Sequence, residues 1–160
     1  MKRGLTKAWL VVGLAAPLSI ALLWSAPSTT GLQASEYPMP SQLEPVETNV
    51  HDFMEYVFEP VYKQLKSSLA DKPDKEGWKT IKSGALTLAE GANLVMIRPR
   101  ESNPDGWIQA AVDVREAGSQ FYQAAKAEDF QASQAGFKQL LNNCNQCHDK
   151  FAGGRPNLKL

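Results

Sequence analysis

Both cysteines of this 160-residue chain and one of its two histidines lie within five positions, in the segment NNCNQCHDKF at residues 142–151. Cys144 and Cys147 are separated by two residues, and His148 follows directly. Thiols and an imidazole at such spacing suit three kinds of chemistry: thiol–disulfide exchange, binding of a zinc ion, and covalent attachment of a metal-containing cofactor. The rest of the chain has to be consistent with whichever chemistry is chosen.

The first two chemistries fit the chain poorly. A thioredoxin-type dithiol lies at the start of a helix that follows a strand, and no strand is predicted before residue 142. A zinc site takes four ligands, whereas the only other histidine is His51, and a histidine directly after the second cysteine is not zinc-finger spacing. A structural disulfide between these cysteines would close a loop too small to constrain much of the unfolded chain.

The pattern C-x-x-C-H is the spacing of c-type haem attachment. Two thiols must each add to one vinyl group of a single porphyrin, and the imidazole must then reach the iron from the same side. In a helix, His148 lies four residues, and so about one turn, after Cys144. We therefore predict one covalent haem c, held through thioether bonds by Cys144 and Cys147, with His148 as the proximal iron ligand.

Apolar residues recur with helical spacing over most of the chain, and hardly any segment alternates with period two. The stripes run over residues 50–69, 78–95, 107–125 and 130–151. Thr48 and Asp129 are the expected N-caps of the first and last helices, Pro60 is expected to kink the first, and the GGRP sequence at 153–156 to end the last. Four amphipathic segments joined by short loops predict an all-α, antiparallel up-down-up-down four-helix bundle that carries the haem near its C-terminus.

The first residues have the pattern of an export signal. Lys2, Arg3 and Lys7 precede an apolar stretch over residues 8–24. We expect residues 1–34 to be a signal peptide, or a membrane anchor if they are retained, and 35–47 to be a proline-containing linker. The haem domain would span 48–153, with a C-terminal tail at 154–160. In either case the domain leaves the cytoplasm, and we expect it in the periplasm.

Charge and composition limit the partners. The first 34 residues hold three of the 17 basic and none of the 17 acidic residues, so the remainder carries a net charge of −3. With no basic stripe, nucleic acid is not an expected partner. We see no acid–base pair or nucleophile constellation, so we do not expect an enzyme.

A haem attached near the end of a four-helix bundle resembles the class II cytochromes c, which include cytochrome c prime and its low-spin relatives. The resemblance covers residues 50–151. It rests on C-N-Q-C-H with Phe151 three positions later, on Lys72-Pro73 in the first loop, and on a Pro-x-x-Trp start to the third helix at 104–107.

The resemblance implies that the residue facing the iron opposite His148 decides the function. In low-spin members a methionine of the first helix binds there, and the family's spacing from Pro73 places Met54 at that position. Met54 also lies on the inward stripe, and His/Met ligation raises the reduction potential. His51, one turn earlier, is an alternative ligand, and a methionine on an apolar helix face can also be core filler.

We therefore predict electron transfer, and the alternative is a five-coordinate haem that binds NO or CO. We expect Phe53 and Phe151 to contact the haem. The sequence departs from the family at Val50 and Ala152, which stand where the family often has arginines that border the haem and its propionates. Redox proteins would bind transiently around the haem edge. Homodimers occur in the family, and membrane contact is expected only if the leader is retained.

Overall fold

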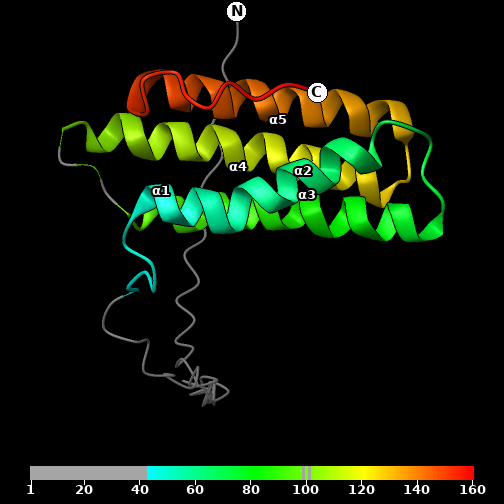
Figure 1. The fold of residues 1–160 in the computed structure, drawn as a ribbon, viewed down its shortest axis with the longest axis horizontal. Coiled ribbons are helices and arrows are strands. Elements are labelled where there is room, and N and C mark those ends of the chain that lie inside the picture. The colour runs from blue at the N-terminus through cyan, green and yellow to red at the C-terminus, as the bar shows by residue number, and fades with distance from the viewer. Residues whose placement is uncertain (1–42, 99, 101) are drawn as a thin grey trace, which may run out of the picture. The chain divides into compact units, whose positions relative to one another are not determined.

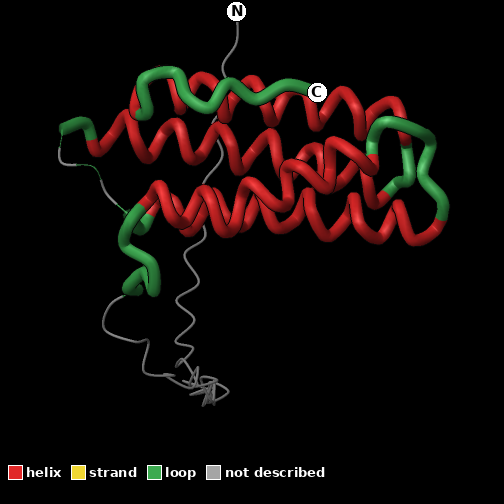
Figure 2. Tube along the Cα trace, viewed as in Figure 1, coloured by secondary structure: helices red, strands yellow, loops and turns green. Residues whose placement is uncertain are grey.

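Every regular element in the part of the chain that the structure describes is a helix (Figure 2). The structure is a computed structural model, and it describes residues 43–98, 100 and 102–160. The expected leader at 1–34 and most of the linker lie outside these residues. Within them, none of the helices has the length and apolar character needed to cross a membrane.

Four helical segments form the fold (Figure 1). The first is continuous but changes type, from α1 (Val50–Phe53) through the π-helical η1 (Met54–Phe58) to α2 (Glu59–Ser68). The other three are α3 (Lys75–Met96), α4 (Pro104–Lys126) and α5 (Phe130–Phe151). The all-helical class and the packing of four helical segments against one another are confirmed.

The irregularity predicted at Pro60 takes the form of the π-helical turn directly before it. Pro60 has no N–H, and in a regular α-helix its ring would press on the carbonyl of Tyr56. In the structure the Glu59 N–H instead donates to the carbonyl of Met54, five residues back. The wider turn places an additional residue in this stretch, and Met54 is its first residue.

The helix ends follow local sequence signals, with one correction. The prediction that Thr48 caps the first helix was wrong: the Asn49 side chain accepts from the His51 N–H at 2.9 Å. Asn49 is the cap because its own carbonyl accepts the first helical bond, from the Phe53 N–H at 3.0 Å. Asp129 caps α5 as predicted, accepting from the Ala132 N–H at 3.0 Å.

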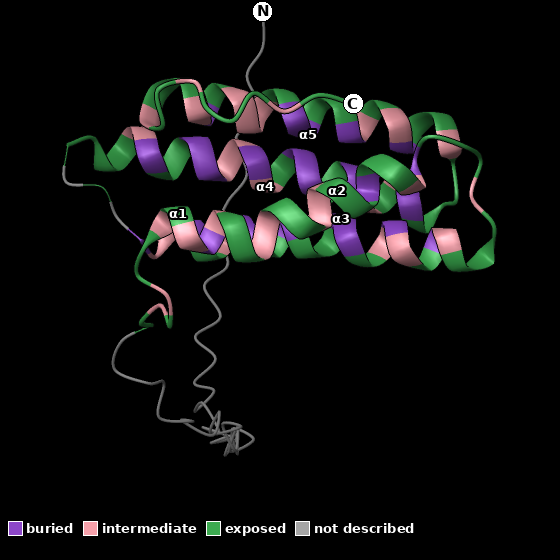
Figure 3. Cartoon of the chain, viewed as in Figure 1, coloured by how far each residue is buried: buried purple, intermediate pink, exposed green. Residues whose placement is uncertain are grey.

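Buried residues, purple in Figure 3, occur in each of the four helical segments and form two clusters. The larger cluster is built around Leu65, Phe121 and Phe137, all fully buried. The smaller one contains Phe53, Val95, Trp107, Ala110, Ala111 and Cys147. The cavity described next is lined by residues that pack against both clusters.

Candidate cofactor site

An apolar cavity of about 270 Å³ lies inside the helical domain. Its walls come from the first helical segment, α3, α4, α5 and the chain after α5. Leu88, Ala92 and Val95 of α3 and Val114 of α4 supply aliphatic surface. A mostly apolar cavity with a few polar groups is the usual form of a cofactor site.

All three residues of the C-x-x-C-H pattern line this cavity. Cys144, Cys147 and His148 lie on α5 at relative positions 0, 3 and 4, which share one face of a helix. Because the helix continues to Phe151, the three side chains are presented from a regular element rather than from a loop. The structure therefore brings together the predicted attachment residues and the predicted proximal ligand.

Both cysteines are free thiols. Burial in apolar surroundings raises the pKa of Cys144 to about 12, with a smaller contribution from a charge on Cys147. Burial also raises the pKa of Cys147, although the positive charges of Lys150 and Arg100 oppose the shift. A reactive dithiol needs at least one thiol with a lowered pKa, so this environment does not suit thiol–disulfide exchange.

The His148 ring is held by the chain that follows α5. Its Nδ1 lies 2.7 Å from the backbone carbonyl oxygen of Pro156. A carbonyl can only accept, so Nδ1 carries a proton, and in the neutral form of imidazole this leaves the lone pair on Nε2. A hydrogen bond of this kind from the second nitrogen is what fixes the tautomer and orientation of metal-binding histidines.

Met54 lines the same cavity from the first helical segment, together with Phe58 and Tyr62. Met54 is half-buried, and its backbone carbonyl is the acceptor that opens the π-helical turn. A π-helical turn within an α-helix is frequent at functional sites. Met54 and His148 therefore line the same cavity from two helical segments that are far apart in the sequence.

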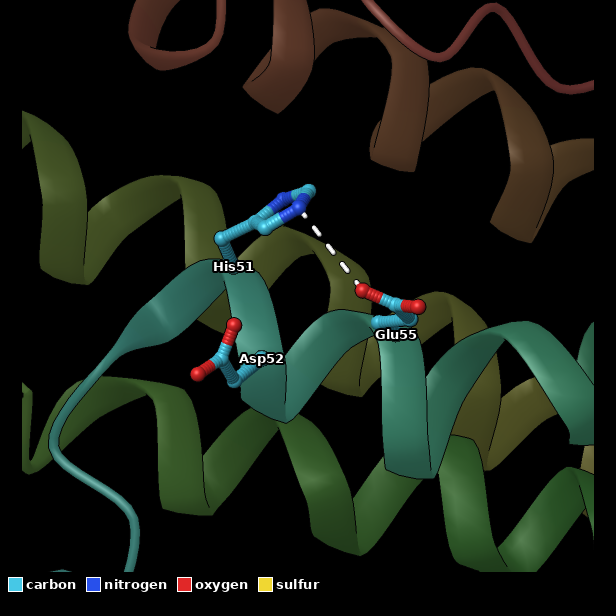
Figure 4. A group of neighbouring side chains, drawn as sticks. All are labelled: His51, Asp52 and Glu55. Carbon is cyan, nitrogen blue, oxygen red and sulfur yellow. Dashed lines mark ion pairs between the residues drawn. The ribbon is translucent and has the colours of Figure 1, made fainter.

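His51 reaches only the rim of the cavity. Its side chain is 82% exposed, and Nε2 lies 3.8 Å from a carboxylate oxygen of Glu55 one turn on (Figure 4). With Asp52 these residues form a group whose potential ligand atoms lie within 4.8 Å of one another, but two of the three residues are exposed. The surroundings of His51 are those of a solvated surface pair, and Met54 is the better placed of the two candidate distal ligands.

Phe53 and Phe151, which we expected to contact the haem, belong to or pack against the smaller cluster, which also contains Cys147. Phe53 packs under the Arg98 guanidinium, 3.9 Å from the ring centroid, and Phe151 meets Trp107 edge-on at 5.2 Å. Among the described residues, neither contributes to the cavity lining.

Phe58 and Tyr62 line the cavity instead, along with Leu158 beyond α5. Phe58 and Tyr62 follow Met54 at spacings of four and eight, so the face of Met54 was the signal that could have found them. No local sequence signal predicts that Leu158 lines the cavity, because its position depends on the turn that the chain makes after α5.

The side chains in this cavity fit a c-type haem. Two thiols suit covalent attachment, an imidazole nitrogen with its lone pair suits iron, and a thioether is a second, softer donor. The aliphatic walls suit the faces of a porphyrin, and the two carboxylates in the lining, Glu55 and Glu59, belong to exposed residues.

No protein-family model matches the chain, and neither does any curated protein or solved structure. The resemblance to the class II cytochromes c therefore stays a prediction, carried by the residues quoted above.

Proposed function

We propose that this protein is an exported monohaem c-type cytochrome of the class II kind that carries single electrons between redox proteins. The observation that carries the proposal is one apolar cavity lined at once by Cys144, Cys147, His148 and Met54. No other grouping of residues in the described part of the chain combines two thiols, an imidazole and a thioether.

Each residue has a separate role in this proposal. Cys144 and Cys147 hold the haem covalently, and His148 and Met54 provide the axial ligands. When bound, the haem supplies one-electron exchange between ferrous and ferric iron. The Pro156 carbonyl keeps the His148 lone pair on Nε2, and the aliphatic walls exclude water, which favours the less charged, reduced state.

We infer that the four helical segments alternate in direction, as an antiparallel up-down-up-down bundle. The short connections at 69–74, 97–103 and 127–129 support this inference, because short loops join antiparallel neighbours. The extensive contacts of α3 with α4 and of α4 with α5 fit the same topology. In this arrangement the haem is attached to the last helix.

A second candidate function is the binding of NO or CO at a five-coordinate iron. One observation favours it: Phe58 also lines the cavity, and its ring lies against Gly91, where an added Cβ would come within 2.8 Å of Cζ. A bulky apolar ring held in this way could occupy the distal side if Met54 did not bind. The ligation state of the iron separates the two functions.

The first experiment asks whether the haem is present. Protein produced in a host able to mature cytochromes c should exceed the mass of its polypeptide by one haem and absorb visible light. The variant with Cys144→Ser and Cys147→Ser should lose the covalent addition. A colourless protein with the mass of the bare chain would end the proposal for both candidate functions.

The second experiment asks which residue faces His148. Met54→Ala should abolish the low-spin spectrum, with its long-wavelength sulfur-to-iron band, and should lower the reduction potential. Met96→Ala is the matched control, because Met96 is also half-buried and packs against the same smaller cluster as Met54, but does not line the cavity. A high-spin wild-type spectrum that shifts with CO, and that Met54→Ala does not alter, would favour gas binding.

A further inference from the structure

The chain after α5 turns back sharply. Gly153 and Gly154 adopt left-handed backbone conformations, with φ of 63° and 76°. The Gly154 N–H donates to the carbonyl of His148 at 2.9 Å and closes the turn. The following residues run back along α5 (Figure 1), and we call residues 153–160 the C-terminal strap.

Side chains of two helices hold the strap. The amide of Asn145 on α5 makes two bonds to one residue, accepting from the Leu158 N–H at 2.8 Å and donating to the Leu158 carbonyl at 3.0 Å. The Tyr62 hydroxyl on α2 donates to the Lys159 carbonyl at 2.6 Å and accepts from the Lys159 N–H at 3.3 Å. Each side chain thus bonds both the N–H and the carbonyl of one strap residue, and such paired hydrogen bonds fix the position and the direction of the strap.

The strap in turn meets the site at two points. The Pro156 carbonyl accepts from His148 Nδ1 at 2.7 Å. Pro156 and Leu158 also belong to the cavity lining, and Leu158 packs against the larger core cluster. Asn145 is hydrogen-bonded to Leu158, which lies only two residues beyond Pro156. The position of the Pro156 carbonyl therefore depends on these hydrogen bonds.

We propose that Asn145 is a positioning residue for His148, which acts through the C-terminal strap and its Pro156 carbonyl. The amide lies one turn before the C-x-x-C-H imidazole and has no part in holding the cofactor itself. Its hydrogen bonds to Leu158 keep the Pro156 carbonyl on Nδ1 of His148, and this leaves the lone pair of Nε2 available in the cavity. This inference rests on the proposed function for its purpose, but the hydrogen bonds that carry it do not.

The first test measures whether Asn145 holds the strap. In Asn145→Ala, amide hydrogen exchange at Leu158 and Lys159 should be about tenfold faster than in the wild type, because the Asn145 hydrogen bonds to Asn157 and Leu158 are lost. Tyr62→Phe removes the second anchor and should also speed exchange at Lys159. Asn142→Ala is the matched control: the same residue type, exposed, on the same helix. Equal exchange in Asn145→Ala and Asn142→Ala would overturn the proposal.

The second test measures the hydrogen bonding of the His148 ring. This property would not change if Asn145 only stabilised the strap. With haem bound and Met54 replaced by Ala, the iron–histidine stretch of the ferrous protein should fall in frequency when Asn145→Ala is added, because a carbonyl on Nδ1 makes the ring a stronger donor. If the protein carries no haem, nitrogen chemical shifts of His148 decide the same point. They should show protonated Nδ1 in the wild type and mainly protonated Nε2 in Asn145→Ala.

Faster strap exchange with an unchanged iron–histidine stretch, or an unchanged tautomer, would also overturn the proposal. Absence of haem would overturn the proposed function alone, since the tautomer measurement is made on whichever form of the full chain is obtained.

Discussion

At the scale of single residues, the site depends on four side chains whose donor atoms line one cavity: Cys144, Cys147, His148 and Met54. The first three could be predicted together because their relation is local, fixed by helical spacing along one element. The tautomer of His148 could not be predicted, because its partner is the Pro156 carbonyl, which reaches the ring only after the chain has turned back.

A residue-scale prediction concerns the pH dependence of thiol reactivity. Because the pKa of Cys144 is raised from 9.0 to about 12, its thiolate fraction at pH 8 is roughly a thousandfold lower than in an unfolded thiol. In the full chain made without haem attachment, Cys144 should react with iodoacetamide slower than in urea, by up to about that factor.

The sign of the pH dependence follows from the raised pKa. Between pH 9 and pH 12 the reaction of Cys144 in the folded chain should keep accelerating, whereas in urea it should level off above pH 9. A mass-spectrometric time course of peptide labelling measures both. Equal rates in folded and urea-unfolded chain at pH 8 would contradict the burial of this thiol.

At the scale of elements, the positions of the helices and a distortion near Pro60 were predictable, but the π-helical form of that distortion was not. Asp129 could be assigned as an N-cap because capping is a local interaction. The π-helical turn at Met54–Phe58 has no periodic signature of its own, so the sequence did not predict it. In the structure Phe53 packs under Arg98, and Phe58 lines the cavity.

An element-scale prediction concerns the contact between α4 and α5. A Cβ added at Gly136 would lie 2.9 Å from the backbone Cα of Phe121, which cannot move without the helix. Gly136→Ala gains about 1 kcal/mol of helix propensity, but overpacking costs about 1–3 kcal/mol. We expect a net loss of stability in urea denaturation.

The same pair of helices offers a control for the propensity gain. Asn142→Ala places alanine at an exposed position of α5 and should raise stability by a few tenths of a kcal/mol. If Gly136→Ala also raised stability, the close approach of α5 to the Phe121 backbone would not exist in solution.

At the scale of the whole molecule, the buried core of the described residues forms two clusters, and residues of both line the cavity. Cys144 packs against the larger cluster, Cys147 belongs to the smaller, and Phe58 packs against both. A group bonded to both cysteines would therefore join the two clusters. The four-segment architecture was predictable from apolar periodicity, but the division of its core was not, since it arises from contacts between residues far apart in the sequence.

The final prediction is that haem attachment supplies a large share of the stability of this domain. The cavity walls are mostly apolar, and a bound haem would remove that surface from water, at about 25 cal/mol for each Å² buried. A whole domain is stable by only about 5–15 kcal/mol, so a few kcal/mol from this burial is a large share. The variant with Cys144→Ser and Cys147→Ser should therefore keep its helical circular dichroism but unfold more than about 10 °C below the haem-bearing protein. Coincident thermal unfolding curves would mean that the two clusters already pack as one core without the cofactor.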